Sequence, residues 1–327
     1  MTSLIVVFII SALLVAWLAS AKSPLKLLDA PNERSLHENP IPKTGGIALL
    51  LALFSGWLWE LQQFDIPMVF VAIFLAALLV AAISFVDDLK ELSPLLRITV
   101  HAVAALILVG SGLTVHDSMA GDVFSFLAII WMLNLYNFMD GMDGFAGGMT
   151  FSGFLFIGLA GYLQGEHLFA LLAWMVAAAS SGFLIRNFPP AKIFMGDTGS
   201  ATLGFLAAAF ALWGVRDDIF ALWFPLLVFS PFVIDATVTL LRRLLRGEKV
   251  WLAHREHYYQ RLALAGWGHR KTVIAEYALM LACGISAMIM LHWPNMLLYG
   301  SLFWLVIYLL LAYLANRLSD TSKSLAS

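Results

Sequence analysis

Three short segments concentrate carboxylates in a chain that carries few charges. They are Asp87-Asp88 with Lys90 close behind, the run from Asn137 through Asp140 to Asp143, and Asp197 within Met-Gly-Asp-Thr-Gly. Carboxylate and amide oxygens are hard ligands, and Mg²⁺ keeps several waters while taking only one or two carboxylates. Ionisable groups beside long apolar runs are costly and mark functional sites. The three segments therefore predict one metal-assisted site.

Spacing within the first two segments assigns roles to their side chains. Asp87 and Asp88 are adjacent, so on a helix they diverge by about 100° and are expected to do different jobs. Asn137, Asp140 and Asp143 recur every three residues, so a helix that continued through them would hold them on one side.

The third segment predicts a helix N-terminus beside the metal. Asp197 or Thr198 is expected to cap a helix that begins near residue 200, because small residues follow. The free N–H groups of a helix N-terminus attract phosphate. This segment therefore predicts a phosphate next to the metal ligands.

A basic loop over 242–272 supplies the fourth element. His254, Arg255 and His257 form a compact group that could bind a diphosphate, with Arg255 in bidentate fashion. The alternative is a juxtamembrane patch that contacts anionic lipid. A histidine metal pair is disfavoured because no third ligand sits at a suitable spacing. Asp235, in the preceding apolar run, is expected to pack against a polar partner rather than react.

Each acidic segment also has an ordinary explanation when taken alone. A pair of aspartates can end a helix in solvent, Asp-Gly-Met-Asp-Gly can be a turn, and Gly-Asp-Thr-Gly can be a cap. The three occur together on one predicted face of a chain with 12% charged residues. That coincidence favours a functional site.

The elements that position these residues are apolar runs long enough to cross a bilayer. Hydrophobic residues make up 61% of the 327 residues, against about 45–50% in soluble domains. About eleven runs approach the roughly 20 residues that a spanning helix needs. The expected spans are 3–20, 46–63, 67–86, 94–110, 123–139, 145–163, 168–186, 200–214, 218–241, 273–291 and 297–315. The sequence thus predicts an all-α polytopic membrane protein.

The distribution of cations predicts the orientation. Of the 19 lysines and arginines, all but Arg216 fall on the side of the membrane that holds the acidic segments. The positive-inside rule then places the N-terminus in the periplasm and the C-terminus in the cytoplasm. Residues 2 and 3 carry no cation, so we expect the first run to be a retained helix rather than a cleaved signal peptide.

The organisation predicted is a single membrane domain over residues 1–327. Its motif-bearing cytoplasmic loops are expected at about 21–45, 87–93, 140–144, 187–199 and 242–272. The single cysteine, Cys283, excludes an intramolecular disulfide.

The chain resembles the polyprenyl-phosphate N-acetylhexosamine-1-phosphate transferases, glycosyltransferase family 4. Five ordered motifs carry the resemblance over roughly residues 25–265. They are the Pro31 to Gly46 loop, Asp87-Asp88 with Lys90, the Asn137 to Gly144 run, Phe194-Met-Gly-Asp197 with its following Gly and Ser, and His254-Arg255-Glu-His257.

The resemblance implies a Mg²⁺-dependent enzyme, with Mn²⁺ as a possible substitute. It would transfer a sugar 1-phosphate from a UDP-2-acetamido sugar to undecaprenyl phosphate and release UMP at the bacterial inner membrane. It implies Asp197 as a metal ligand with Asn137 or Asp140 beside it, and Asp87 and Asp88 as the essential catalytic pair. The remaining implied roles concern substrate: Lys90 on the lipid phosphate, His254, Arg255 and His257 on the donor diphosphate, and Phe194 and Asp143 beside the uridine.

The sequence of the last cytoplasmic loop indicates which branch of the family the chain resembles most. It reads His-Arg-Glu-His rather than the three consecutive histidines of the peptidoglycan branch, so the O-antigen-initiating, lipopolysaccharide branch is favoured. A CDP-alcohol phosphotransferase is disfavoured because no arginine follows Asp143-Gly144. A transporter is disfavoured because ion sites favour the bilayer midplane. The donor sugar and the oligomeric state stay open, with a homodimer as one option.

Overall fold

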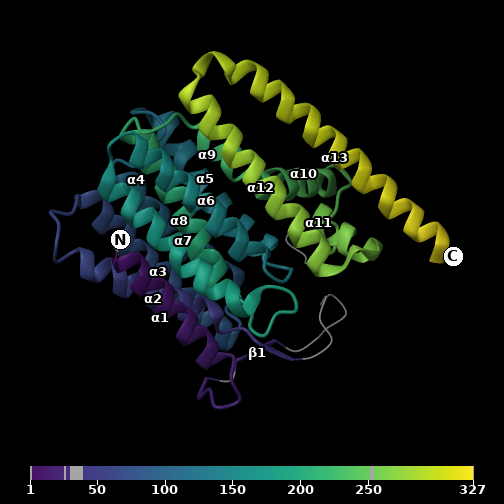
Figure 1. Cartoon of the computed structure of the whole chain (residues 1–327), viewed down its shortest axis with the longest axis horizontal. Coiled ribbons are helices and arrows are strands. Elements are labelled where there is room, and N and C mark those ends of the chain that lie inside the picture. The colour runs from purple at the N-terminus through teal and green to yellow at the C-terminus, as the bar shows by residue number, and fades with distance from the viewer. Residues whose placement is uncertain (1, 26, 30–39, 251–253, 327) are drawn as a thin grey trace.

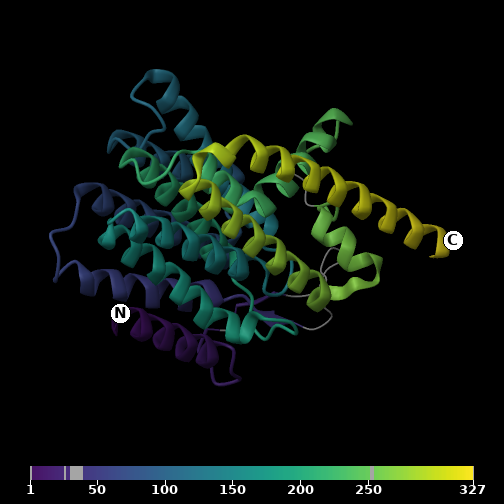
Figure 2. The same ribbon diagram turned by 45° about the horizontal axis from the view of Figure 1, so that its top comes forward.

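The computed structural model describes residues 2–25, 27–29, 40–250 and 254–326 and shows an all-α bundle (Figure 1). Two views 45° apart show most helices packed side by side, with α13 running along one flank and projecting beyond the bundle (Figures 1 and 2). The long helices are α1 (Thr2–Leu18), α2 (Gly45–Glu60), α3 (Met68–Lys90), α4 (Pro94–Gly110), α5 (Met119–Met139), α6 (Phe145–Leu163), α7 (His167–Asn187), α8 (Gly196–Arg216), α10 (Ser230–Leu245), α12 (Gly268–His292) and α13 (Leu297–Ala326).

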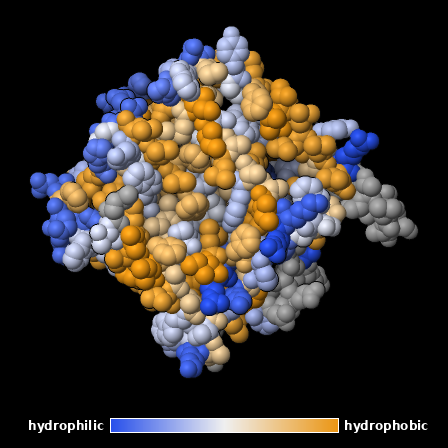
Figure 3. Space-filling view, viewed as in Figure 1, coloured by the Kyte–Doolittle hydropathy of each residue, from blue (hydrophilic) through white to orange (hydrophobic). Residues whose placement is uncertain are grey.

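The predicted fold class, an all-α polytopic membrane protein, is confirmed. Within the described residues, seven helical segments are long and apolar enough to cross a membrane, and α1, α2 and α4 are shorter apolar helices. Space-filling Figure 3 shows apolar residues across the middle of one face and hydrophilic residues toward its margins. Such a surface suits contact with lipid chains.

The centre of the bundle is α8, which is almost wholly buried. Its first turn lies against the first turn of α2 at a close approach of two glycines. A Cβ on Gly46 would lie 2.4 Å from the Cα of Gly199, so neither position has room for a side chain. Small residues allow membrane helices to approach this closely. The contact fixes the start of α8 beside the loop that precedes α2.

The span expected over 218–241 is not one helix. The chain forms α9 (Trp223–Val228) and then α10, with the break at Phe229. Pro231 occupies the first turn of α10, where its missing N–H costs nothing, whereas inside one long helix it would remove a hydrogen bond. The break gives α10 its own direction toward the 246–257 segment.

The predicted loop over 242–272 is shorter in the structure. α10 continues to Leu245, and α11 (Tyr258–Leu262) leads through a π-helical turn (Ala263–Trp267) into α12. The first loop contains a two-residue antiparallel pair, β1 (Leu28–Asp29) with β2 (Ile41–Pro42). The motif residues between 30 and 39 lie outside the described residues.

Candidate active site

A cavity of about 530 Å³ lies where the predicted acidic segments meet. It is bounded by the end of α3, the start of α4, the end of α5, the start of α8 and the segment before α11. The prediction that distant segments gather at one end of the bundle is therefore confirmed. The lining residues are Ser84, Asp87, Pro94, Arg97, Ile98, His101, Leu133, Asn134, Asn137, Phe138, Asp197, Ala201, Val250, His254 and His257.

Asp87 faces this cavity from the last turn of α3. One of its oxygens accepts a hydrogen bond from the backbone N–H of Leu92 at 2.7 Å, and the other lies 2.8 Å from the guanidinium of Arg97. The carboxylate is buried, so these two contacts fix its orientation. Asp87 therefore presents an oriented anion to the cavity.

Asp88 turns toward α8 and is not among the cavity-lining residues. Its carboxylate accepts from the backbone N–H of Asp197 at 3.3 Å and of Thr198 at 2.9 Å, and from the Thr198 hydroxyl at 2.6 Å. The two neighbouring aspartates thus do different jobs, as their spacing predicted.

The prediction that Asp197 or Thr198 caps α8 is wrong. The helix begins earlier, at Gly196, with Met195 in the capping position and no side-chain cap. Asp88 takes the role instead, because its carboxylate occupies two N–H groups of the first turn. These N–H groups are the ones that would otherwise attract phosphate.

Two cations that the sequence did not single out neutralise the aspartates. Arg97 bridges Asp87 and Asp197, at 2.8 and 3.5 Å, from the first turn of α4. Lys43 lies 3.3 Å from Asp88. Lys90, which was expected at the lipid phosphate, is exposed at the end of α3 and does not line the cavity. The only signal for Lys43 was its place in the first motif-bearing loop, and Arg97 was only one of the cations on the predicted cytoplasmic side.

Asp197 and Asn137 both line the cavity and fit a Mg²⁺ site. The side chain of Asn137 lies near the Asp197 carboxylate. Within the described residues no three His, Cys, Asp or Glu side chains form a ready metal site. A carboxylate and an amide completed by waters are, however, a donor set that Mg²⁺ accepts.

Asp140 lies next to this pair, at the end of α5. Burial, and then the negative charges of Asp197, Asp88 and Asp29, raise the pKa of Asp140 well above its usual range. A divalent cation would relieve this repulsion, so the local charge also fits the metal.

Asp143 is not brought to the cavity. The helix ends at Met139, and Gly144 adopts a positive φ of 75°, so the expected helical continuation through Asp140 and Asp143 is wrong. The Asp143 carboxylate accepts from Ala191 N at 2.9 Å and lies 3.0 Å from Nδ1 of His269. Asp143 holds the segment after α7 against the start of α12.

Phe194 belongs to the same segment and ties it to α2. Its backbone N–H donates to Pro42 at 2.7 Å, and its carbonyl accepts from Gly45 at 2.9 Å. Phe194 is half-buried and does not line the cavity. Asp143 and Phe194 thus both hold in place the segment between α7 and α8, Asp143 through Ala191 and Phe194 through its own backbone.

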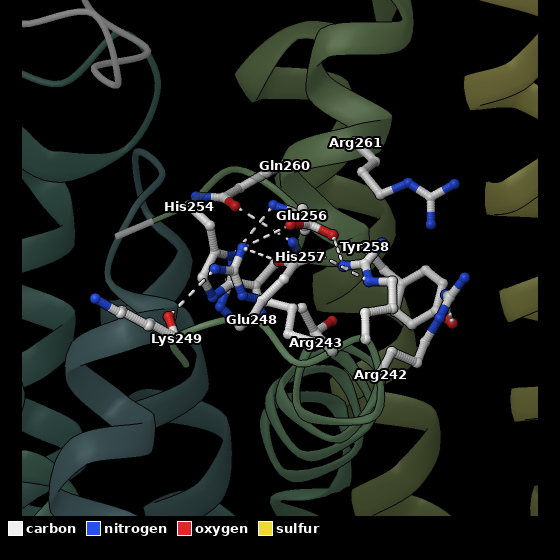
Figure 4. A network of polar contacts seen from close by, with 12 residues as sticks. Arg242, Arg243, Glu248, Lys249, His254, Glu256, His257, Tyr258, Gln260 and Arg261 are labelled. Atoms are coloured by element: carbon white, nitrogen blue, oxygen red, sulfur yellow. Dashed lines mark hydrogen bonds and ion pairs between the residues drawn. The ribbon is translucent and has the colours of Figure 1, made fainter. Parts of the chain in front are cut away.

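The histidine loop reaches the cavity through His254 and His257, whose rings are tilted by 32° with their centres 4.8 Å apart (Figure 4). Nδ1 of His254 accepts from the backbone N–H of Glu256 at 3.3 Å, which leaves Nε2 as a donor when the ring is neutral. Burial, then the charges of His257 and Arg243, lower the pKa of His254 to about 4. His254 is therefore neutral near pH 7 and contributes a hydrogen bond rather than a positive charge.

Asp235 anchors His257, and the expectation that it packs against polar partners is confirmed. One oxygen lies 3.1 Å from Nδ1 of His257 and accepts from Tyr258 N at 3.0 Å, while the other accepts from Tyr259 N at 3.1 Å. Asp235 therefore fixes both the imidazole and the first turn of α11. Its importance to the site was not evident from the sequence.

A network of charges holds this loop against α10 (Figure 4). Glu256 bridges Arg243, at 2.5 Å, and Arg246, while Glu248 lies 3.3 Å from Arg243 and 2.9 Å from Arg246. Arg255 sits half-buried between the histidines and outside the cavity lining. The network holds in place the loop that carries the two cavity-lining histidines.

The sequence matches known proteins along most of its length. The profile of glycosyl transferase family 4 matches residues 70–215. The decaprenyl-phosphate N-acetylglucosaminephosphotransferase of Mycolicibacterium smegmatis is 32% identical over 76% of this chain and 71% of its own. The probable undecaprenyl-phosphate N-acetylglucosaminyl 1-phosphate transferase of Bacillus subtilis is 28% identical over 89% and 86%. The undecaprenyl-phosphate alpha-N-acetylglucosaminyl 1-phosphate transferase of Escherichia coli is 25% identical over 88% and 83%.

The fold and the site together define a polytopic membrane protein with an acidic cavity at one end of its helix bundle. The chain belongs to glycosyl transferase family 4. The matched region runs from α3 to α8 and contains the aspartates of all three acidic segments.

Proposed function

We propose that this protein transfers an N-acetylhexosamine 1-phosphate from a UDP-sugar to undecaprenyl phosphate and releases UMP. The observation that carries the proposal is the cavity in which Asp87, Arg97, Asn137, Asp197, His254 and His257 meet. The names of the similar proteins support a polyprenyl-phosphate acceptor and favour N-acetylglucosamine as the sugar.

The donor would lie with its diphosphate against the histidine loop. His254 offers Nε2–H, and His257, held by Asp235, offers its own Nε2 to the same cavity. Mg²⁺ bound at Asp197 and Asn137, with Asp140 beside them, would neutralise diphosphate charge and favour departure of UMP. The resemblance implies that Arg255 would also bind the donor diphosphate.

The acceptor would approach from the α4 side of the cavity. Pro94, Ile98 and Leu133 give that part of the lining an apolar character suited to an isoprenoid chain. A phosphate monoester is largely dianionic near neutral pH, so it is already a nucleophile. Arg97 would hold it, and Asp87 would orient it and accept any residual proton.

The proposed reaction is a direct displacement. An oxygen of the lipid phosphate attacks the β-phosphorus of the UDP-sugar, the bond to the bridging oxygen breaks, and UMP takes the electron pair. The product is a lipid-linked diphosphate sugar. We propose that it initiates O-antigen or a related lipopolysaccharide or surface polysaccharide.

The proposed topology has eleven spans in the bacterial inner membrane, with the N-terminus periplasmic and the site facing the cytoplasm. Cysteines placed at Arg246 and Ser322 should be shielded from an impermeant thiol reagent in intact cells. One placed at Asp217 should be labelled. Labelling at position 246 would reverse the orientation and remove cytoplasmic nucleotide sugars as donors.

The test of the activity is a comparison of donors. Membranes that contain the protein, and membranes that lack it, are incubated with radiolabelled UDP-N-acetylglucosamine and with other UDP-2-acetamido sugars. Butanol-extractable label should depend on the protein and appear with one donor above the others. Label that is equal in both membranes for every donor would contradict the proposal.

A further inference from the structure

The active-site cavity continues below its acidic residues, deeper into the helix bundle. α3 and α5 end at the site, whereas α4 and α8 begin there, so lining residues one turn further along each helix lie at a deeper level. Three to four residues of a helix correspond to about 4.5–6 Å. We call these deeper residues the lower layer; they are Ser84, His101, Leu133, Asn134 and Ala201.

Two polar side chains of the lower layer are buried without a hydrogen-bond partner. Ser84 is 4% exposed and His101 is 8% exposed. The Thr150 and Thr202 hydroxyls, also buried in helices, donate to the carbonyl four residues earlier. Within the described part of the chain, the Ser84 hydroxyl and the His101 ring make no such bond. A buried polar group without a partner is costly, so these two indicate a bound molecule that supplies one.

Both side chains can be reached from the cavity. Ser84 and His101 are lining residues, and neither is among the partnerless polar side chains that the protein encloses completely. Serine offers an O–H donor, and an imidazole offers at least one N–H donor whether it is neutral or protonated. The lower layer therefore presents two donors to a molecule in the cavity.

Arg97 adds further donors next to these two. His101 lies one turn further along α4 and is close enough to Arg97 and Asp87 to interact electrostatically with both. Arg97 contacts Asp87 and Asp197 through one nitrogen, Nη1. Within the described residues its Nε and Nη2 make no hydrogen bond, so their N–H groups can bind an anion.

The rest of the lower layer selects for an apolar molecule. Leu133 and Ala201 are apolar, and the amide nitrogen of Asn134 already donates to the carbonyl of Ile130 at 2.8 Å. Ile98, which lines the cavity between Arg97 and His101, is exposed, so apolar surface is available beside the donors. A sugar nucleotide carries many hydroxyl groups that such walls would leave unpaired. A phosphate on a hydrocarbon chain matches both the donors and the walls.

We infer that Ser84 and His101 bind the phosphate of the lipid acceptor directly, together with Arg97. The inference rests on the proposed function and assigns two residues to its acceptor. A phosphate monoester has three terminal oxygens, of which one attacks the donor. The Ser84 hydroxyl, an imidazole N–H of His101 and the free N–H groups of Arg97 hold the other two. This arrangement places the isoprenoid chain beside Ile98.

The first experiment measures acceptor binding without turnover. Full-length protein in phosphatidylcholine nanodiscs receives undecaprenyl phosphate or undecaprenol, with no UDP-sugar, and retained lipid is counted by native mass spectrometry. Wild type should prefer the phosphate. His101→Leu should weaken retention of undecaprenyl phosphate about ten- to a hundredfold, and Ser84→Ala about tenfold, as expected for lost hydrogen bonds to a charged group. Retention of undecaprenol should not change.

The second experiment separates hydrogen bonding from packing. His101→Gln keeps an N–H donor but fills the apolar space less well, so it should bind undecaprenyl phosphate better than His101→Leu does. In transfer assays, His101→Leu and Ser84→Ala should raise the KM for undecaprenyl phosphate and leave the KM for the UDP-sugar within about twofold. Their Tm without acceptor should stay near that of wild type, because no hydrogen bond within the described protein is lost.

Matched controls come from the same residue types elsewhere. His116→Gln changes an exposed histidine between α4 and α5, at the end of the bundle away from the cavity. Ser181→Ala removes a hydroxyl that donates to Ala178 within α7. Both variants should retain undecaprenyl phosphate as wild type does.

Three results would overturn the inference while the proposed function stands. They are unchanged retention of undecaprenyl phosphate in both His101→Leu and Ser84→Ala, a rise in the KM of the UDP-sugar alone, and tighter binding by His101→Leu than by His101→Gln. A wild-type protein that neither prefers undecaprenyl phosphate over undecaprenol nor transfers sugar 1-phosphate would contradict the proposed function, and the inference with it.

Discussion

Replacing Asp88 with alanine should damage the fold more than the same change at Asp87, although the two residues are neighbours. Only 2% of the Asp88 side chain is exposed, and it accepts from two N–H groups and a hydroxyl of α8 while pairing with Lys43. Removing one partner of a buried, paired charge costs about 3–5 kcal/mol. The Asp87 partners, Leu92 N and the half-exposed Arg97, can be rehydrated at lower cost.

Thermal unfolding in detergent, followed by tryptophan fluorescence, measures this difference. A loss of 1 kcal/mol lowers Tm by about 2–4 °C in soluble domains of 150–250 residues, so a loss of about 3–5 kcal/mol in Asp88→Ala should lower Tm by roughly 6–20 °C. Asp87→Ala should lower it by less than half as much. Asp65→Ala, which changes an exposed aspartate, is the control and should leave Tm unchanged.

The second measurement is transfer activity at a temperature below the thermal unfolding of both variants. Both variants should lose transfer, Asp87→Ala because it removes a group from the cavity and Asp88→Ala because it releases the turn that carries Asp197. Equal Tm values for the two variants would refute the division of labour. So would an Asp88→Ala protein that keeps wild-type stability and loses only activity.

The remaining predictions concern charge in the cavity. Asn137→Ala should raise the Mg²⁺ concentration needed for half-maximal transfer about tenfold or more, because one oxygen ligand is lost; an unchanged Mg²⁺ requirement would remove Asn137 from the metal site. Arg97→Gln should lower kcat/KM by about one to two orders of magnitude, because a charge-assisted bond is worth about 1.5–3 kcal/mol, and full activity would mean that Arg97 only balances charge. His254→Gln should keep the wild-type shape of the pH profile of kcat/KM from pH 6 to 8, because the His254 pKa of about 4 places its titration below that range; loss of a titration step near neutrality in this variant would contradict the assignment.

The helices were predictable because their signal is compositional. Apolar runs of about 20 residues need no partner to be identified, and most expected spans agree with the observed helices within a few residues. The break at Phe229 was missed because Pro231 is compatible with both a kink and a new helix. Sequence periodicity could not decide between them.

The meeting of the acidic segments was predictable from topology, but the role of each side chain was not. Asp88 caps α8 from 109 residues away in sequence, and Asp235 fixes His257 across 22 residues. Such contacts depend on how helices pack. Asp143 lies outside the cavity because α5 ends at Met139 and residues 140–144 form a turn into α6, whereas the spacing alone had continued the helix.

Arg97 is a cavity residue that the sequence did not single out. In the sequence it was one cation among the many on the predicted cytoplasmic side. In the structure its guanidinium lies between Asp87 and Asp197 at the cavity, which Lys90 does not line. Counting lysines and arginines predicts which side of the membrane carries positive charge. It does not predict which of these residues reaches the cavity.

We expect this cavity, which Asp197 lines, to join a sugar 1-phosphate to a polyprenyl phosphate. Purified protein in nanodiscs of defined lipid, with Mg²⁺, undecaprenyl phosphate and labelled UDP-N-acetylglucosamine, provides the direct measurement. Wild type should form lipid-linked diphosphate sugar and UMP in equal amounts. Asp197→Asn, folded to the same Tm within a few degrees, should form neither. Product at the wild-type rate in Asp197→Asn would contradict the account, as would UMP release without a matching lipid product.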